Sequence, residues 1–354
     1  MRVVYFGTYE RRYPRNAQVI SCLRRVGVEV IERHEPVWEG REQKWGLGPG
    51  ALPRLALAQA RLLRAKQVDA DAVVVGYPGH LDLVAARRFA RGRPVVFNPL
   101  VSLVDSFVSD RGRFRAGSLP ARALAAIDRR ALRAADLVVA DTQANAEFLG
   151  ELAEVPPERF AVCFVGAEER VFQPGWAASD LRKVVFVGKL IPLHGLETIL
   201  EAARIAPDVA LRVIGSGQLQ PLLETRPPNV EWVPWVPYEQ LAVELRRAAC
   251  ALGIFGVSEK AGRVIPNKAF QALACGVPLV TADTPAGREL LVDGESALLV
   301  PRGNAAALAD ALRRLTTDDS LAGLIAAGGL ETYRRRASED VLGARWRELL
   351  EARR

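Results

Sequence analysis

The sequence has few histidines and cysteines and lacks any long apolar run. It contains 3 histidines and 4 cysteines in 354 residues. The cysteines are far apart and form no Cys-x-x-Cys pair, which argues against a zinc site and a disulfide framework and predicts a reduced, cytoplasmic protein. No apolar stretch approaches the roughly 20 residues that span a bilayer. The short apolar N-terminus runs into Arg11 and Arg12, unlike a signal peptide.

The chain is moderately basic and rich in apolar residues. Its formal net charge is +7, and 49% of its residues are hydrophobic. At this length the apolar share supports a large buried core in about two domains. The arginines are scattered along the expected helices without interleaved aromatic residues, so nucleic-acid binding is disfavoured. The positive charge has two interpretations. It belongs to an ordinary solvated surface, or it attracts phosphorylated small molecules or anionic lipid.

Short runs rich in Val, Ile and Leu alternate with amphipathic stretches along the whole chain. Such runs are typical of strands buried on both faces of parallel sheets, and their alternation with helices predicts a doubly wound α/β architecture. The expected strands are Val3–Phe6, Val28–Ile31, Ala72–Val75, Pro94–Phe97, Leu137–Ala140, Val184–Val187, Ala210–Ile214, Val230–Trp232, Ala251–Ile254, Pro278–Thr281 and Ala297–Val300. Helices with one buried face are expected at Ala121–Ala135 and Leu196–Arg204.

A segment rich in glycine, proline and charge interrupts this alternation from Gly166 onwards. We expect an N-terminal domain at 1–168, a linker at 169–180 and a C-terminal domain at 181–337. A charged amphipathic helix at 338–354 is expected to pack back on the N-terminal domain. Ligands of doubly wound folds bind at the carboxyl ends of the strands, so the loops there carry the candidate site residues.

The strand-end loops of the N-terminal half hold five candidates. Gly7 ends the first expected strand and lets a ligand approach the backbone closely. Arg15 lies near the N-terminus of the next helix, which attracts anions. His80, Asn98 and Asp105 follow later strands, where a histidine can contact a ligand or transfer a proton. The structural alternatives are a tight turn at Gly7 and a buried structural histidine at His80.

The strand-end loops of the C-terminal half point to a bound phosphate. Lys189 directly follows a strand, and His194 lies in the same loop. A fixed cation there would stabilise the charge of a departing diphosphate, and the structural alternative is a surface lysine. Asn267 and Lys268 lie in the first turn of a later helix, where backbone N–H groups hold phosphate or sugar hydroxyls. Gln271 follows one turn later on the same face.

Several segments match known motifs in the same order along the chain. VGKLIPLHG is similar to V-G-R-x-x-x-x-K-G, and NVEWVPWVPYEQL to N-V-x-F-x-G-x-V-P-x-E-x-L. QALACGVPLV and ELLVDGESALLV resemble E-A-M-A-C-G-x-P-V-V and E-L-x-x-D-G-x-x-G-L-L-V. All four motifs belong to the retaining GT-B glycosyltransferases of family 4. In the N-terminal half, ADLVVADTQANAEFL and CFVGAEERVFQP resemble that family's last N-domain strand and linker entry.

The resemblance implies a GT-B fold of two facing Rossmann-like domains, with a nucleotide sugar bound mainly by the C-terminal domain. It puts Lys189 where the family has an arginine that binds the diphosphate, and His194 where the family has a lysine. It also puts Trp235, Val236 and Pro237 in the loop that borders the nucleobase.

Two positions depart from the family's E-x7-E motif. Gln271 falls on the second glutamate, which holds the ribose hydroxyls, and Arg263 falls on the first. A glutamine binds ribose more weakly than a carboxylate does, whereas Arg263 offers a cation to the diphosphate. The sequence IPNK, which includes Lys268, resembles the I-P-x-K of a subfamily. Glu259 is a further candidate on the donor side.

The expected function is transfer of a hexose from a nucleoside diphosphate sugar, with retention of configuration. Lys189, Arg263 and Lys268 are expected to stabilise the leaving diphosphate, and His80 to contact the sugar or acceptor. We expect no cofactor beyond the sugar nucleotide itself. We also expect no metal site, because these cations take the metal's role and Asp69-Ala-Asp71 precedes a strand at the opposite edge.

The acceptor side is assigned to Arg15, Asn98 and Asp105, without identifying the acceptor. An anionic or lipid-linked acceptor stays open, as does peripheral contact with the inner face of a membrane. Two other functions stay open too. A sugar-nucleotide epimerase would need carboxylates and histidines in the cleft as acids and bases. A non-catalytic donor-binding protein would fit the departures at Gln271 and Arg263.

Overall fold

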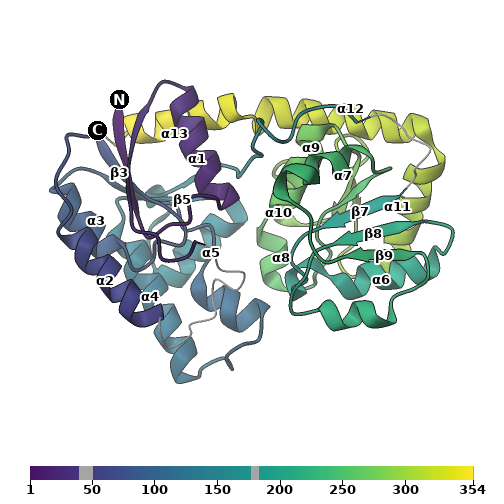
Figure 1. The fold of residues 1–354 in the computed structure, drawn as a ribbon, viewed down its shortest axis with the longest axis horizontal. Helices are drawn as coiled ribbons and strands as arrows, with labels where there is room; N and C mark the ends of the chain where they lie inside the picture. The colour runs from purple at the N-terminus through teal and green to yellow at the C-terminus, as the bar shows by residue number, and fades with distance from the viewer. Residues whose placement is uncertain (40–50, 177–182, 354) are drawn as a thin grey trace. The chain divides into compact units, whose positions relative to one another are not determined.

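A computed structural model describes residues 1–39, 51–176 and 183–353 of the chain. The chain divides into two compact units, one of Met1–Val165 with Glu339–Arg354 and one of Gly166–Ser338. Each unit contains one six-stranded sheet with helices around it (Figure 1). All neighbouring strands in both sheets are parallel, as the Val-rich runs predict.

The first unit has the strand order β2-β1-β3-β4-β5-β6. Its strands are β1 (Arg2–Gly7), β2 (Glu29–His34), β3 (Ala72–Val75), β4 (Val95–Phe97), β5 (Leu137–Ala140) and β6 (Phe160–Val162). Because β2 and β3 lie on opposite sides of β1, the strand order reverses between β1 and β3. The loops that follow these two strands therefore flank the topological switch point, where doubly wound folds bind ligands.

Helices cover both faces of this first sheet. One face carries α2 (Ala51–Leu63), α3 (Leu83–Ala90), α4 (Leu119–Ala134) and α5 (Gln143–Ala153), and the other carries α1 (Pro14–Arg25) and α13 (Glu339–Glu351). Alternate residues of β1 face the two layers, as the period of a strand requires: Val4 packs towards α2–α5, and Val3 towards α1 and α13. Leu342 and Trp346 of α13 are buried in the latter layer, so the C-terminal helix completes the core of the first unit.

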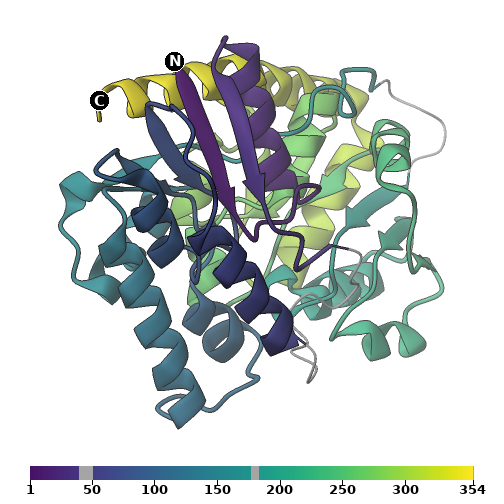
Figure 2. The same ribbon diagram turned by 60° about the vertical axis from the view of Figure 1, so that its left-hand side comes forward.

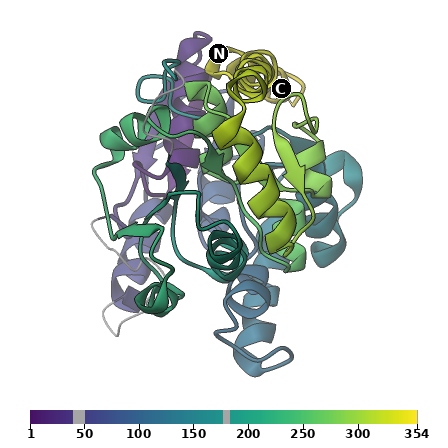
Figure 3. The same cartoon turned by 90° about the vertical axis from the view of Figure 1, so that its right-hand side faces the viewer.

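The second unit has the strand order β12-β11-β10-β7-β8-β9, and Figure 3 turns this unit towards the viewer. Its strands are β7 (Val184–Val187), β8 (Leu211–Ile214), β9 (Val230–Val233), β10 (Ala251–Leu252), β11 (Leu279–Ala282) and β12 (Leu298–Val300). Its helices are α6 (Leu196–Ile205), α7 (Leu241–Arg246), α8 (Glu259–Arg263), α9 (Asn267–Cys275), α10 (Pro285–Arg288), α11 (Ala305–Thr317) and α12 (Asp319–Arg336). The order reverses between β7 and β10, so the loops after these strands flank the second switch point.

Each strand expected from the sequence is present, with ends shifted by at most three residues. The sequence missed β6, a short edge strand that is only half-buried. The expected linker, 169–180, stays a prediction. Its residues 177–180 lie outside the described part of the chain, and the preceding residues pack on the second unit, where the Trp176 indole donates to the Ala248 carbonyl at 2.7 Å. Among the described helices, none is long and apolar enough to cross a membrane.

Candidate functional site

The loops that follow β7 and β10 meet backbone to backbone at the second switch point. The first of these loops contains the helical turn η3 (Pro192–His194) and then Gly195, which has a φ of +67°. A Cβ atom on Gly195 would lie 2.5 Å from the carbonyl carbon of Phe255, and one on Gly256 would collide with the Leu193 carbonyl oxygen. Only glycine allows this approach. The two loops therefore form one surface, onto which α8 and α9 project their first turns.

Lys268 of α9 points into this junction. Its side chain is buried, and its Nζ lies 3.7 Å from the centroid of the Phe186 ring. A Cβ atom on Gly188 would lie only 2.7 Å from this Nζ. No hydrogen-bond partner for Nζ exists among the described residues, and burial lowers the pKa of Lys268 well below 10.5. Because a buried amine without a counter-ion is costly, an incoming anion would be stabilised here.

His194 lies beside Lys268. Its Nδ1 faces the Lys189 carbonyl oxygen, and its ring centroid lies 5.6 Å from that of Phe186. Burial lowers the pKa of His194 well below 6.5, and the charges of Lys268 and Lys260 lower it further. The neutral ring therefore carries its proton on Nδ1, so His194 must be protonated before Nε2 can donate to a phosphate.

Lys260 is a basic residue of this site that the sequence analysis did not single out. It is 6% exposed, on α8, close enough to His194 for its charge to affect that ring. Ser258 caps α8 by accepting from the Ala261 N–H at 3.3 Å. The signal in the sequence was a serine cap followed directly by charged residues, which marks a helix start but does not show that Lys260 turns inwards. Lys260 thus joins His194 and Lys268 as a third basic side chain at the junction.

The remaining donor candidates lie around this group with different degrees of burial. Lys189 is exposed, and its backbone carbonyl meets His194. Asn267 is half-buried at the first position of α9. Arg263 Nη1 lies 3.4 Å from Glu259 Oε2, and the Glu259 side chain is 93% exposed. Glu259 is therefore a surface partner of Arg263, and its donor contact stays a prediction.

Gln271 is tied to a phenol and a carboxylate that the sequence analysis did not consider. It is buried, and its side chain lies close to the hydroxyl of Tyr238, which also lies close to Glu168. Burial raises the pKa of Tyr238, and the charge of Glu168 raises it further. Tyr238 directly follows the expected nucleobase loop, in which Trp235 is 72% exposed while Val236 and Pro237 are half-buried.

In the first unit, Gly7 lies against a buried carboxylate. A Cβ atom on Gly7, which has a φ of +126°, would collide with Asp82 Oδ2. Asp82 accepts from the Thr8 backbone N–H at 2.7 Å and from Gln59 Nε2 at 2.5 Å. Its complete burial raises the pKa of Asp82, against the opposing effect of these hydrogen bonds. Gly7 is thus required for a tight turn, and a ligand contact there stays a prediction.

His80 is held by protein groups on both ring nitrogens. Nδ1 faces the Pro78 carbonyl oxygen, and Nε2 lies 3.3 Å from Asp128 Oδ1. Asp128, which the sequence analysis did not identify, is fully buried and also accepts from Ser102 Oγ at 2.7 Å. Asp105 is also buried. Its backbone N–H donates to Ser102 Oγ at 3.1 Å. These contacts join the loops after β3 and β4, and a catalytic role for His80 stays a prediction.

Arg15 and Asn98 are paired inside the first unit. Arg15 is fully buried, and its Nε donates to Asn98 Oδ1 at 2.8 Å. Its Nη1 donates to the carbonyl oxygens of Cys163 at 3.0 Å and Phe164 at 2.8 Å. The guanidinium carbon lies 5.9 Å from the centroid of the Trp346 ring on α13. These contacts give Arg15 an internal structural role, and an acceptor would have to displace them.

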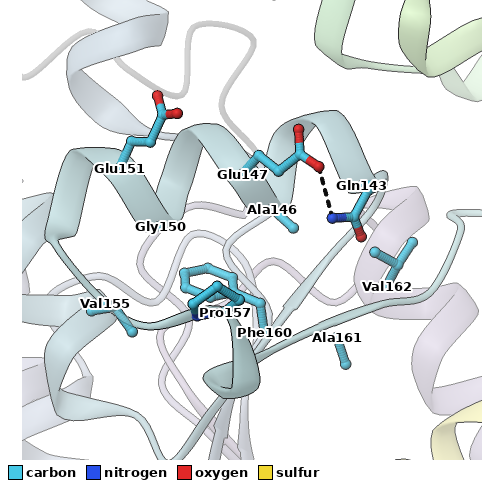
Figure 4. A pocket seen from close by; sticks show the side chains of 10 residues that line it. All are labelled: Gln143, Ala146, Glu147, Gly150, Glu151, Val155, Pro157, Phe160, Ala161 and Val162. Carbon is cyan, nitrogen blue, oxygen red and sulfur yellow. Dashed lines mark hydrogen bonds between the residues drawn. The ribbon is translucent and has the colours of Figure 1, made fainter.

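A hollow of about 380 Å³ lies between α5 and β6 (Figure 4). Its walls include the apolar side chains of Val155, Phe160 and Val162. At its rim, Gln143 Nε2 donates to Glu147 Oε1 at 2.9 Å. None of the candidate residues lines this hollow. This hollow is therefore separate from the candidate residues at the switch points.

The described residues contain no group of three or more His, Cys, Asp or Glu side chains that could hold a metal ion. Asp69 and Asp71 lie at the amino edge of the first sheet, where the Arg2 backbone N–H donates to Asp71 Oδ2 at 2.8 Å. Transfer without a metal or another cofactor stays a prediction for experiment.

Two family models match successive parts of the chain. Residues 1–166 match the model described as a glycosyl transferase 4-like domain, and residues 181–318 match the one described as glycosyl transferases group 1. With the two doubly wound parallel sheets, these matches define a glycosyltransferase of the GT-B fold. Such an enzyme transfers a sugar, which excludes the epimerase and non-catalytic alternatives as leading interpretations. The chain belongs to the GT4-type glycosyltransferases.

Curated relatives agree with this assignment. The chain is 27% identical to the D-inositol 3-phosphate glycosyltransferase of Nocardioides sp., over 87% of this chain and 73% of that protein. It is 29% identical to the enzyme of the same name from Mycolicibacterium smegmatis, over 72% of this chain and 63% of that protein. It is also 35% identical to the phosphatidyl-myo-inositol mannosyltransferase of Mycobacterium leprae, over 44% of this chain and 42% of that protein. The chain thus spans less than two thirds of the length of the latter two relatives.

Solved structures share the fold at low sequence identity. Sucrose-phosphate synthase from Thermosynechococcus elongatus has a TM-score of 0.75 at 15% identity, covering 99% of this chain and 98% of that chain. Anabaena HepE, solved in complex with UDP-glucose, has a TM-score of 0.70 at 17% identity, covering 99% of this chain and 100% of that chain.

Proposed function

We propose that this enzyme transfers a hexose from a nucleoside diphosphate sugar to an anionic acceptor, with retention of configuration. The observation that carries the proposal is the group of His194, Lys260 and Lys268 at the switch point of the second sheet. In particular, the amine of Lys268, which has no hydrogen-bond partner among the described residues, is buried where a diphosphate would gain a counter-ion. The complex of Anabaena HepE with UDP-glucose supports a donor of this class.

The donor's diphosphate binds at the β7–β10 junction in this proposal. The buried side chains of Lys268 and His194 contact the oxygens of the diphosphate, and the exposed side chain of Lys189 contacts them from the solvent side. As the bond between the sugar and the diphosphate breaks, negative charge grows on the leaving oxygen, and cations fixed there lower the barrier. Gln271 and Tyr238 hold the ribose, and the loop from Trp235 borders the base. Lys189, His194 and Lys268 together supply the positive charge that a metal ion supplies in other transferases.

The acceptor is proposed to be a polyol that carries phosphate. Two relatives have D-inositol 3-phosphate and phosphatidyl-myo-inositol in their names, and this supports an acceptor of this class. Asp105 and His80 follow strands of the first sheet near its switch point, where acceptor hydroxyls would bind, whereas Asn98 is fully buried against Arg15. Because Arg15 is fully buried, the acceptor's phosphate needs a different cation from the one that the sequence suggested.

Native mass spectrometry with a panel of nucleotide sugars tests the donor. We expect one nucleoside diphosphate hexose to bind and to be hydrolysed slowly without acceptor, releasing nucleoside diphosphate. Lys268→Met should weaken this binding, whereas Lys66→Met, which removes the same charge from an exposed position, should leave it unchanged. The donor proposal fails if no nucleotide sugar binds, or if Lys268→Met binds it normally.

The stereochemistry and the metal requirement need their own measurements. Proton NMR of the first product formed should give the same anomeric configuration as the donor. Activity should survive EDTA, because the described residues offer no carboxylate group with the ligand density of a magnesium or manganese site. An inverted product would overturn retention, and activity lost in EDTA and restored by manganese would overturn metal independence.

A further inference from the structure

The outer sides of α2, α3 and α4 carry basic and apolar side chains but no carboxylate. Figure 1 labels these helices, and in Figure 2 they run side by side as the dark blue to teal helices at the lower left. Their inner sides, with Leu62, Phe89 and Leu132, are buried against the first sheet. Within their bounds the one acidic residue is Asp128, which is fully buried beside His80. We call the exposed side of these three helices the α2–α4 face.

The arginines of the α2–α4 face are numerous and only partly paired. The exposed ones are Arg54, Arg61, Arg87, Arg88, Arg122, Arg129, Arg130 and Arg133. Arg61, Arg87 and Arg133 form ion pairs, each with a carboxylate outside the three helices. In the part of the chain that the structure describes, Arg54, Arg88, Arg122 and Arg130 contact no carboxylate. The face therefore presents uncompensated positive charge.

Large apolar side chains stand exposed on the same face. Leu52 is 64% exposed, Leu57 53%, Val84 51% and Leu119 79%. Leu52, Val84 and Leu119 each lie within the first two residues of a helix. In a parallel doubly wound sheet these helix starts follow the carboxyl ends of the strands. These three apolar side chains therefore lie towards the sheet edge that carries Gly7 and the other candidate residues, whereas Leu57 lies further along α2.

We propose that the α2–α4 face docks on the surface of a bilayer that contains anionic lipid. Arginines attract the negatively charged headgroups, and exposed leucines between them enter the boundary of the acyl chains. Leucine gains nothing on a phosphate backbone, so the same apolar residues disfavour a nucleic acid. An acidic protein is the alternative occupant, and vesicle binding by the purified chain distinguishes the two. This inference does not depend on the identity of the donor.

Sedimentation with lipid vesicles tests the proposal directly. The full chain should bind phosphatidylcholine vesicles that contain roughly one third phosphatidylglycerol, and binding should weaken as salt is added. Pure phosphatidylcholine vesicles and a short DNA duplex at the same ionic strength should bind much less. Equal binding to neutral vesicles, or tighter binding to the duplex, would overturn the proposal.

A matched pair of double variants separates this face from net charge. Arg88→Ala with Arg130→Ala removes two of these arginines from the face, and Arg314→Ala with Arg334→Ala removes two exposed arginines from α11 and α12 that form no ion pair with a described residue. Each basic residue near an anionic surface contributes roughly fivefold, so the first pair should weaken vesicle binding roughly thirtyfold. The second pair should leave it nearly unchanged. Equal losses in both pairs would reduce the effect to overall charge and contradict docking by this face.

A second pair tests the apolar part of the face. Leu57→Gln should lower binding to the anionic vesicles while leaving its salt dependence intact. Leu324→Gln, at a position of α12 that is 59% exposed, is the control and should change neither. Unchanged melting temperature and unchanged nucleotide binding in all variants show that the donor site is intact. If Leu57→Gln binds vesicles as tightly as the control, no side chain enters the bilayer boundary and the proposal fails.

Discussion

The Lys268 ammonium lies over the face of Phe186, with 3.7 Å between Nζ and the ring centroid, and no described hydrogen-bond acceptor reaches it. A cation gains some energy over an aromatic ring, but it loses its hydration when it is buried. Gly188 leaves just enough room for the amine, because a Cβ there would lie 2.7 Å from Nζ. The ligand-free site is therefore held in an unfavourable state that an anion would relieve.

The first prediction is that Lys268→Met stabilises the ligand-free enzyme while it impairs transfer. Replacing a buried, unpaired charge with an apolar side chain of similar length should raise the free energy of unfolding by about 1–4 kcal/mol. The loss of a fixed cation should lower kcat roughly hundredfold. Urea unfolding and steady-state kinetics measure the two effects. A destabilised variant would assign Lys268 a structural role instead.

A second prediction concerns the pH dependence of stability. Burial lowers the pKa of Lys268 in the folded state below the value of 10.5 that it has when unfolded. Between these two values the unfolded chain binds more protons, so stability rises with pH. The advantage of Lys268→Met should therefore be full below the folded pKa and shrink as the pH rises towards 10.5. Thermal unfolding of both proteins in parallel checks this, and an advantage that grows with pH contradicts it.

Nucleoside diphosphate binding should be accompanied by proton uptake. The pKa values of Lys268 and His194 are both lowered in the free enzyme, and bound phosphate would raise them again. Affinity should consequently fall as the pH rises through the pKa values that these two groups have in the free enzyme. Calorimetric titrations in two buffers that differ in ionisation enthalpy measure the number of protons bound. Lys268→Met should take up fewer protons, and equal uptake in both proteins would exclude Lys268 as the acceptor of the proton.

Gly188→Ala should damage the site more than backbone strain explains. Gly188 has a φ of +153°, and the new methyl group would also press on Lys268 Nζ and on His194 Cε1, 3.2 Å away. Gly294, with a φ of +74° and open space around it, is the control, so Gly294→Ala should cost only about 1 kcal/mol of stability. We expect Gly188→Ala to weaken nucleotide binding at least tenfold and the control to leave it intact. Equal binding by both variants would show that the amine simply moves aside.

Gln271→Glu should weaken the enzyme, although a carboxylate is usual at this position in the family. The Tyr238 hydroxyl has one proton and already interacts with Glu168. Two carboxylates would compete for that proton, which should cost about 1–3 kcal/mol of stability. Adding Glu168→Gln should restore what Gln271→Glu loses, and a double-mutant cycle measures this coupling. A variant that is more stable and binds nucleotide more tightly would favour the family's pattern over the contacts described here.

Local sequence patterns predicted the strands because runs of Val and Leu determine strand burial directly, as in β3 and β7. β6 escaped because its three residues, Phe160–Val162, are half-buried at a sheet edge. The fate of charged side chains depends on distant packing instead. Arg15 and Lys268 both lie in the first turn of a helix, yet Arg15 is held by carbonyl groups near β6, whereas Lys268 Nζ has no hydrogen-bond partner among the described residues. No pattern around either residue distinguishes the two outcomes.

The course of the chain through α13 has a consequence for biosynthesis. Leu342, Trp346 and Leu350 fill the core on one face of the first sheet, and Leu342 lies beside Cys163. The ribosome must therefore complete Gly166–Ser338 before it makes the helix that closes the earlier unit. The second unit is a single continuous segment of the chain and can fold before α13 is made. Until then, the apolar side of α1 remains exposed to solvent. Newly made chains should depend on chaperones during that interval, because the exposed apolar surface favours aggregation.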